Sequence, residues 1–198
     1  EDYRLCLEPQ PWAIMATKMG ESVLSSAERS TLVQSMENLL HLGAPGTWDV
    51  SSAQRGITGA AVASKCWHNG SSGFPCGYHE NAGAWYSQNH PLVMALAQEN
   101  ASLAWKEWVA NSLFHSARLW PTYWPGIWSA ADAYGSSLAS FKSGAVGISY
   151  FPDMPVFCTH AHAWPLYSMA RMAGLTFDHG GLRVNPAVPL EMGDYAFL

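Results

Sequence analysis

Aromatic and histidine side chains dominate the residues of this sequence that are able to do chemistry. Ten Trp, eight Tyr, seven Phe and eight His accompany only 10 basic and 15 acidic residues. Flat rings with a polar edge favour a site or interface that stacks neutral, hydroxylated ligands. Four rings lie in a Pro- and Gly-rich stretch where they would form a stacking wall for a pyranose: Trp120, Tyr123, Trp124 and Trp128. For any single ring, packing between helices is the alternative interpretation.

Histidines provide the candidates for metal ligation. His160 and His162 are two positions apart, and His68 and His79 bracket a cysteine-containing loop. Because a helix has about 3.6 residues per turn, residues two positions apart at a helix start diverge by about 200°. No carboxylate spacing completes a three-ligand set. We therefore expect no metal site.

Motifs of other enzyme classes are missing from the sequence. It has no G-x-S-x-G nucleophile motif, no P-loop and no dinucleotide-binding fingerprint. Asp132 and Asp153 follow the aromatic stretch and are candidate catalytic carboxylates, although helix capping explains them equally well.

Length and charge limit the partners of the chain. Its 198 residues fit one domain or a large piece of one, and its formal net charge is −5. Nucleic acid is an unexpected partner because phosphate contacts need clustered basic side chains, which the sequence lacks. No apolar run approaches the roughly 18 residues of a membrane span.

The cysteines and two glycosylation sequons bear on the compartment. Asn69 and Asn100 each begin an N-x-S sequon. The sequence leaves open three complete pairings of its four cysteines, and the 66–76 pair would close a turn-rich loop. The disulfide candidates are Cys6, Cys66, Cys76 and Cys158. Chance sequons and buried free thiols are the alternative, but together these features favour a secreted, extracellular or lumenal protein.

The first half of the chain predicts three helices. One is expected over 9–19, where prolines suit its start and Gly20 its end. A capping box of Ser25 and Glu28 begins the next, which runs to His41. Residues 43–80 form a long covering loop, and a third helix runs over 80–98 with a bend at Pro91.

The second half predicts three more helices. Asn100 or Ser102 caps one over 103–115, Ser129 caps a short one to residue 141, and the last spans 161–173 with Gly174 following its end. Residues 182–184 and 187–189 are expected to be short extended pieces. About six helices, forming three helical hairpins, predict a mostly α domain.

Four stretches read in order resemble one known family. They are Arg4–Met15, Glu80–Ser87, Thr159–Trp164 and Gly181–Pro189. Together they are similar to the C-terminal half of the (α/α)6-barrel catalytic domain of the cellobiose and chitobiose phosphorylases, glycoside hydrolase family 94. More broadly they resemble the six-hairpin glycosidases. The resemblance implies a partial (α/α)6 toroid that spans residues 1–198.

In such a barrel the inner helices direct their N-termini and preceding loops at a central cleft. The resemblance implies that Glu80 and Asn81 bind sugar hydroxyls there, beside a subsite wall of Trp85 and Tyr86. Free N–H groups at a helix start favour an anion such as phosphate. The other residues expected to bind substrate are His90, Trp124, Trp128, Thr159, His160 and His162. Glu80 acting only as a helix cap, and His162 lying in the core, are the alternatives.

The sequence departs from the family at functional positions. The histidine that the family assigns to phosphate is Ser87 here, and the nearest histidine is His90. The glycine that lets the family's backbone approach phosphate is His160, whose side chain blocks a tightly held anion. No stretch matches the one that carries the family's catalytic aspartic acid. The catalytic residues are therefore unknown, and the general acid is expected outside this chain.

Three hairpins cannot close a six-hairpin barrel, so we expect the remaining half to come from the same precursor or from another chain. The leading hypothesis is a carbohydrate-active subunit, similar to glycoside hydrolases and phosphorylases, that acts on a β-linked gluco-oligosaccharide or glucan. No cofactor is expected, apart from inorganic phosphate as co-substrate if the reaction is phosphorolysis. The rival hypothesis is a non-catalytic glycan-binding or structural module of a secreted assembly.

Overall fold

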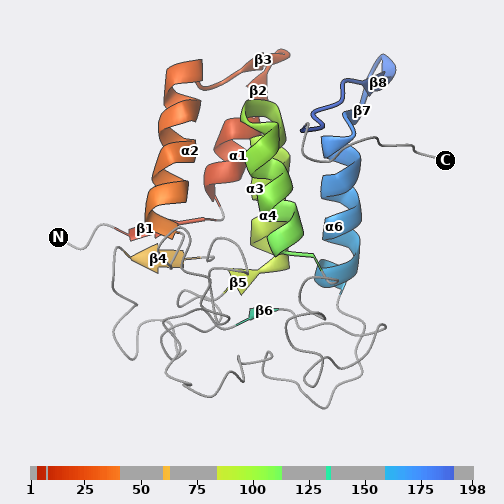
Figure 1. Cartoon of the computed structure of the whole chain (residues 1–198). Helices are drawn as coiled ribbons and strands as arrows, with labels where there is room; N and C mark the ends of the chain where they lie inside the picture. The colour runs from red at the N-terminus through yellow and green to blue at the C-terminus, as the bar shows by residue number, and fades with distance from the viewer. Residues whose placement is uncertain are drawn as a thin grey trace.

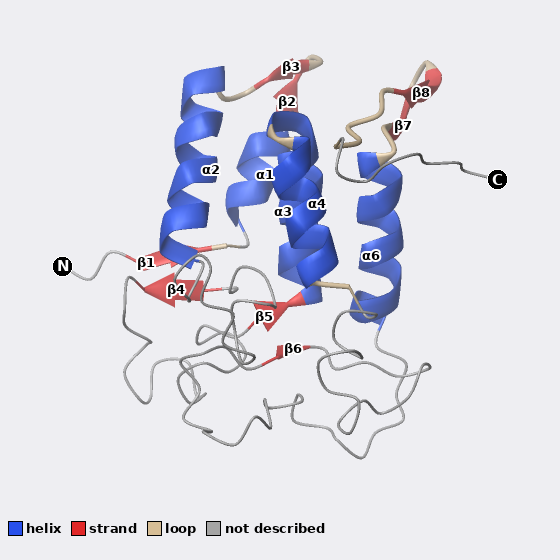
Figure 2. Ribbon diagram, in the orientation of Figure 1, coloured by secondary structure: helices blue, strands red, loops and turns tan. Residues whose placement is uncertain are grey.

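The computed structural model describes residues 4–7, 9–40, 60–62, 84–112, 133–134 and 159–189. These residues form upright helices with short strand pairs at the two ends of the group (Figures 1 and 2). The described helices are α1 (Pro9–Met15), α2 (Ser26–Leu40), α3 (Tyr86–Glu99), α4 (Ala101–Ala110) and α6 (Thr159–Met172). The mostly helical class predicted from the sequence is confirmed for this part of the chain.

Helix α3 lies at the centre and contacts α1, α2, α4 and α6. The reason is visible in its sequence, because every residue from Leu92 to Leu96 is apolar and almost completely buried. Successive helical residues point about 100° apart, so five consecutive buried side chains need neighbours on all sides. The core around α3 also includes Leu7, Ile14, Val33, Met36, Ala104 and Met172.

The described strands form four antiparallel pairs. Two are local hairpins: β2 (Thr17–Lys18) with β3 (Glu21–Ser22), and β7 (Leu175–Asp178) with β8 (Gly181–Val184). The other two join distant segments of the chain: β1 (Arg4–Cys6) pairs with β4 (Ala60–Val62), and β5 (Ala84–Trp85) pairs with β6 (Ala133–Tyr134). These long-range pairs tie the segments between helices back to the bundle.

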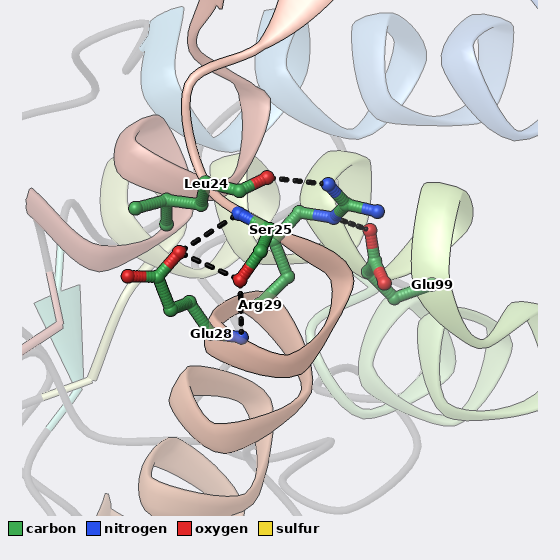
Figure 3. Close-up of polar contacts among 5 residues, drawn as sticks. All are labelled: Leu24, Ser25, Glu28, Arg29 and Glu99. Carbon is green, nitrogen blue, oxygen red and sulfur yellow. Dashed lines mark hydrogen bonds and ion pairs between the residues drawn. The ribbon is translucent and has the colours of Figure 1, made fainter.

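The start of α2 confirms the predicted capping box (Figure 3). The Glu28 backbone N–H donates to Ser25 Oγ at 3.3 Å, and the Ser25 backbone N–H donates to Glu28 Oε2 at 2.8 Å. These reciprocal bonds satisfy N–H groups that have no partner inside the helix. The hydrogen bonds from Ser25 lower the pKa of Glu28. Beside the box, Arg29 pairs with Glu99 and also donates to the Leu24 carbonyl, which holds the start of α2 against the end of α3.

Two other predicted helix ends are confirmed. Asn100 caps α4, since its Oδ1 accepts the Leu103 N–H at 3.1 Å. Gly174 follows α6 with φ +78°, and its N–H donates to the Arg171 carbonyl. Glycine adopts this left-handed conformation without a steric penalty, which is why it ends so many helices.

Several predicted boundaries are wrong. The 9–19 helix stops at Met15, because Met19 and Gly20 (φ 54° and 89°) form the two-residue turn of the β2–β3 hairpin. The helix predicted over 80–98 begins only at Tyr86 and continues through Pro91, with β5 in front of it. The helix predicted over 103–115 begins two residues earlier, at Ala101, and ends earlier than predicted, at Ala110.

Strand pairing also overrides two other expectations. Ala133–Tyr134 lie in strand β6 and not in the helix predicted to end at residue 141. The predicted 43–80 loop contains β4. The last helix begins two residues earlier than predicted, and 182–184 lie in β8 as expected, whereas 187–189 form no strand. Such pairings depend on partners far along the chain, which periodicity does not reveal.

In the part of the chain that the structure describes, no helix combines the length and the apolar character that crossing a membrane requires.

Candidate functional site

Helices α3 and α6 begin at the same end of the molecule, which we call the helix-start end. The two helices contact each other, and Figure 1 shows both rising from its lower side. Two observations show the relative direction of the helices. His90 of α3 is hydrogen-bonded to Ser168 of α6, and later in both helices Met94 and Arg171 line the same pocket. The helices therefore run parallel, so their positive N-terminal ends face the same way.

The β5–β6 pair lies at the helix-start end. Ala84 is opposite Tyr134, and Trp85 is opposite Ala133. Since β5 runs directly into α3, this pair places the segment that follows the aromatic stretch beside the start of α3 (Figure 2). Backbone pairing thus joins two of the regions that the sequence singled out.

His90 links α3 to α6 in the interior of the bundle. Its side chain has no exposed surface, and Nδ1 lies 2.9 Å from Ser168 Oγ. The Ser168 hydroxyl donates its hydrogen to the Pro165 carbonyl at 3.1 Å. Because that hydrogen is already used, the Ser168 oxygen acts as the acceptor for an N–H on His90 Nδ1. Burial lowers the pKa of His90 to about 3, because desolvation penalises the charged ring more than a hydrogen bond to the Asn111 backbone favours it. His90 is thus a neutral link between helices.

A second set of buried polar residues holds the C-terminal end of α4 at the helix-start end of the molecule. The Asn89 Nδ2 donates to Asn111 Oδ1 at 2.7 Å, and the Asn111 Nδ2 donates to the Glu107 carbonyl at 2.8 Å. Trp108 stacks on Trp105 with ring centroids 5.5 Å apart, and its Nε1 donates to the Pro165 carbonyl at 3.1 Å. These bonds fix α4 against both helices that begin at this end.

Residues that hold the helix-start end together were missed in the sequence. They are Asn89, Glu107, Asn111, Pro165 and Ser168. The sequence did contain one signal. Asn89 comes shortly before an apolar run that begins at Leu92, which indicates that it is buried too, and buried polar groups need hydrogen-bond partners. The partners themselves come from three helices, and no local pattern connects them.

The predicted substrate-binding residues fall into three groups. Trp85 ends β5 and Tyr86 begins α3, while Thr159, His160 and His162 lie in the first turn of α6, all at the helix-start end. His90 is buried between these helices. Outside the described residues lie Glu80, Asn81, Trp124 and Trp128.

The remaining predictions concern modification and metal. Cys6 ends β1, whereas the other disulfide candidates Cys66, Cys76 and Cys158, and the sequon residue Asn69, lie outside the described residues. Asn100 is exposed at the α4 cap. Among residues with described positions, no group of three or more His, Cys, Asp or Glu is arranged to hold a metal ion.

Neither a scan against protein-family models nor a search of curated proteins finds a match to this chain.

Proposed function

We propose that this chain forms half of a six-hairpin glycosidase-like barrel and takes part in binding and cleaving a β-linked gluco-oligosaccharide or glucan. The observation that carries the proposal is the common start of α3 and α6 at one end of the molecule. The resemblance assigns substrate to these two helix starts, which are 73 residues apart in sequence, from Tyr86 to Thr159.

Two of the other predicted residues are close in sequence to the β5–β6 pair. Glu80 precedes Ala84 by four residues, and Trp128 precedes Ala133 by five. Since β5 and β6 pair at the helix-start end, we propose that both residues act there.

Exposed apolar side chains support a partner that completes the barrel. On α6, Leu166 is 74% and Tyr167 is 52% exposed, and Trp12 on α1 is 49% exposed. Large apolar groups on the outer sides of helices are the surface that neighbouring hairpins would cover in a closed toroid. We infer that the remaining half of the barrel, from the same precursor or another chain, packs there and brings the general acid.

The position of His90 favours hydrolysis over phosphorolysis. His90 is the histidine nearest to the family's phosphate-binding position, but it is buried, neutral and bonded to Ser168. The aligned residue itself is Ser87, which carries no charge. The same observation favours the second candidate, a non-catalytic glycan-binding or structural module, since it leaves the phosphate site of the family without its histidine.

Secretion and glycosylation form part of the proposal. The α4 cap uses Asn100 Oδ1, whereas an N-linked glycan is attached to Nδ2. A glycan at this exposed position is therefore compatible with the cap. Treatment of the natively produced protein with a glycosidase that removes N-linked glycans should lower its mass, and an unchanged mass contradicts the assignment.

The test of function is incubation of the intact native particle with β-gluco-oligosaccharides, with and without phosphate. We expect free reducing ends in both conditions. Sugar phosphate formed only with phosphate would instead show phosphorolysis. Binding without any product would support the module, and neither binding nor product would refute both candidates.

The mass of the native particle tests the half-barrel. A particle heavier than this chain, with other polypeptide retained, is the expected result. A monomer of this chain alone that binds the oligosaccharides would contradict a barrel completed by a partner.

A further inference from the structure

A pocket of about 450 Å³ lies at the opposite end of α3 and α6, which we call the hairpin end. The second half of α3, the last turn of α6, the β7–β8 hairpin and the segment after it surround the pocket. Its described lining residues are Met94, Ala97, Gln98, Arg171, Gly174, Thr176, Arg183, Asn185 and Ala187. This volume lies within the range typical of small-molecule sites.

The β7–β8 hairpin turns its polar face toward the pocket. Thr176 pairs with Arg183, so these side chains share one face, and both line the pocket. The opposite face carries the pairs Leu175–Val184 and Phe177–Leu182, with Phe177 82% exposed. The hairpin therefore directs its polar face, and not its apolar face, toward the pocket and the helices.

Backbone contacts hold the pocket wall in place. The Asn185 N–H donates to the Gly174 carbonyl, and the Ala187 N–H donates to the Met172 carbonyl, both at 2.9 Å. A Cβ at Gly174 would overlap the backbone of Asn185 and Pro186, so this close approach needs glycine. The wall that carries Asn185 is therefore fixed to the end of α6.

The chemistry of the lining residues indicates an anion with hydroxyl groups. Arg171 and Arg183 supply two guanidinium groups, which bind phosphate or carboxylate with paired hydrogen bonds. None of the described lining residues carries a carboxylate. Thr176, Gln98 and Asn185 add hydroxyl and amide groups suited to sugar hydroxyls.

We propose that this pocket binds a monosaccharide that carries a phosphate or carboxylate group. Arg171 and Arg183 hold the anionic group, the hydroxyl and amide side chains hold the sugar hydroxyls, and Met94, Ala97 and Ala187 contact its apolar face. The site is separate from the helix-start end, so it stands or falls independently of the proposed function.

Arg171 also has a structural role, which the experiment must distinguish from its role in ligand binding. It lies in the last turn of α6, where a cation is favoured by the helix dipole. The carbonyls of Met169, Arg171 and Met172 accept backbone N–H groups, so they are engaged and not directed at an incoming anion. Loss of stability in an Arg171 variant is compatible with the structural role alone, whereas loss of ligand affinity is specific to the site.

The experiment is calorimetric titration of the intact protein with glucose 6-phosphate, glucuronate, inorganic phosphate and glucose. At least one sugar anion should bind more tightly than both phosphate and glucose. The double variant R171Q/R183Q should weaken that binding about tenfold or more, since each guanidinium supplies charge-assisted hydrogen bonds. The control K106Q removes one positive charge from an exposed position on α4, and its affinity should match the unaltered protein.

Circular dichroism confirms the fold of each variant. If the double variant does not fold, R183Q alone carries the test, because Arg183 lies on the exposed hairpin. The proposal is overturned if no sugar anion binds at millimolar concentration, if glucose binds as tightly as its phosphate, or if R183Q leaves the affinity unchanged.

Discussion

The two ends of the α3–α6 pair are built in different ways. At the helix-start end, residues that the sequence pattern singled out, such as Trp85 and Thr159, lie at or next to the starts of two parallel helices. At the hairpin end, the polar groups come from α3, α6, the β7–β8 hairpin and the segment after it, and no motif links Gln98, Arg171 and Arg183. The comparison teaches that a local sequence pattern can point to only one kind of candidate site, whereas side chains that converge from distant segments become visible only in the fold.

The largest expected effect concerns the hairpin end. Gly174→Ala should lower the free energy of unfolding by about 3 kcal/mol or more, because it combines a left-handed conformation with overlap on the Asn185 backbone. Urea unfolding followed by circular dichroism measures the change. The matched control is Gly20→Ala, which has a similar φ but open space around it and should cost about 1 kcal/mol. Equal losses in the two variants would show that the wall does not depend on close approach.

The second prediction concerns His90, which links α3 to α6 in the interior of the bundle. The folded protein keeps His90 neutral down to a pKa of about 3, whereas in the unfolded chain it titrates near 6.5. Between these values the unfolded state binds more protons. The His90 contribution to stability is therefore complete above pH 6.5 and falls by about 1.4 kcal/mol per pH unit as the pH decreases toward 3.

Chemical unfolding at a series of pH values measures this slope, with His90→Gln as the reference that lacks the titrating ring. The variant should be less stable at pH 7, and the difference from the unaltered protein should shrink as the pH falls. Parallel curves for the two proteins would mean that His90 is not held neutral in the folded state.

A smaller effect is expected where α4 supports the helix-start end. Trp108→Phe removes the hydrogen bond to the Pro165 carbonyl but keeps an aromatic ring beside Trp105. We expect a loss of about 1–2 kcal/mol in thermal unfolding. Sugar-anion binding at the hairpin end should be unchanged, and a change there would show that the two ends are coupled.

The smallest effect separates capping from glycosylation at Asn100. Asn100→Ala should cost about 1 kcal/mol because the Leu103 N–H loses its acceptor. Asn100→Asp keeps an acceptor and should retain the stability of unglycosylated protein, while both variants remove the sequon. If the Asp variant is as unstable as the Ala variant, the cap does not account for the effect.

Much of the fold was predictable where the signal is local. The Ser25–Glu28 box, the Asn100 cap and the Gly174 helix end are each defined within a few residues, and the structure confirms all three. Leu103, Trp105 and Trp108 recur at helical spacing in the sequence, and all three pack against the core. Local hydrogen-bonding chemistry and helical periodicity are sufficient for such features.

Features that depend on distant partners were not predictable. The β5–β6 pair makes Ala84 and Trp85 a strand because residues 133–134 lie beside them, and β1 likewise pairs with residues 60–62. His90 was predicted to contact substrate, but Ser168, 78 residues away, lies beside it in the interior. Sequence spacing identifies the residues that are able to do chemistry, and tertiary packing decides which of them are exposed.

One measurement tests the division between the two ends most directly: oligosaccharide affinity of the intact protein, compared between Trp85→Ala and R171Q/R183Q. Trp85→Ala should weaken binding of a β-gluco-oligosaccharide about tenfold, because the variant removes the ring that we propose stacks on the sugar, and R171Q/R183Q should leave it unchanged. Unaltered oligosaccharide binding in Trp85→Ala, or equal weakening in both variants, would contradict a glycan site at the start of α3 and α6.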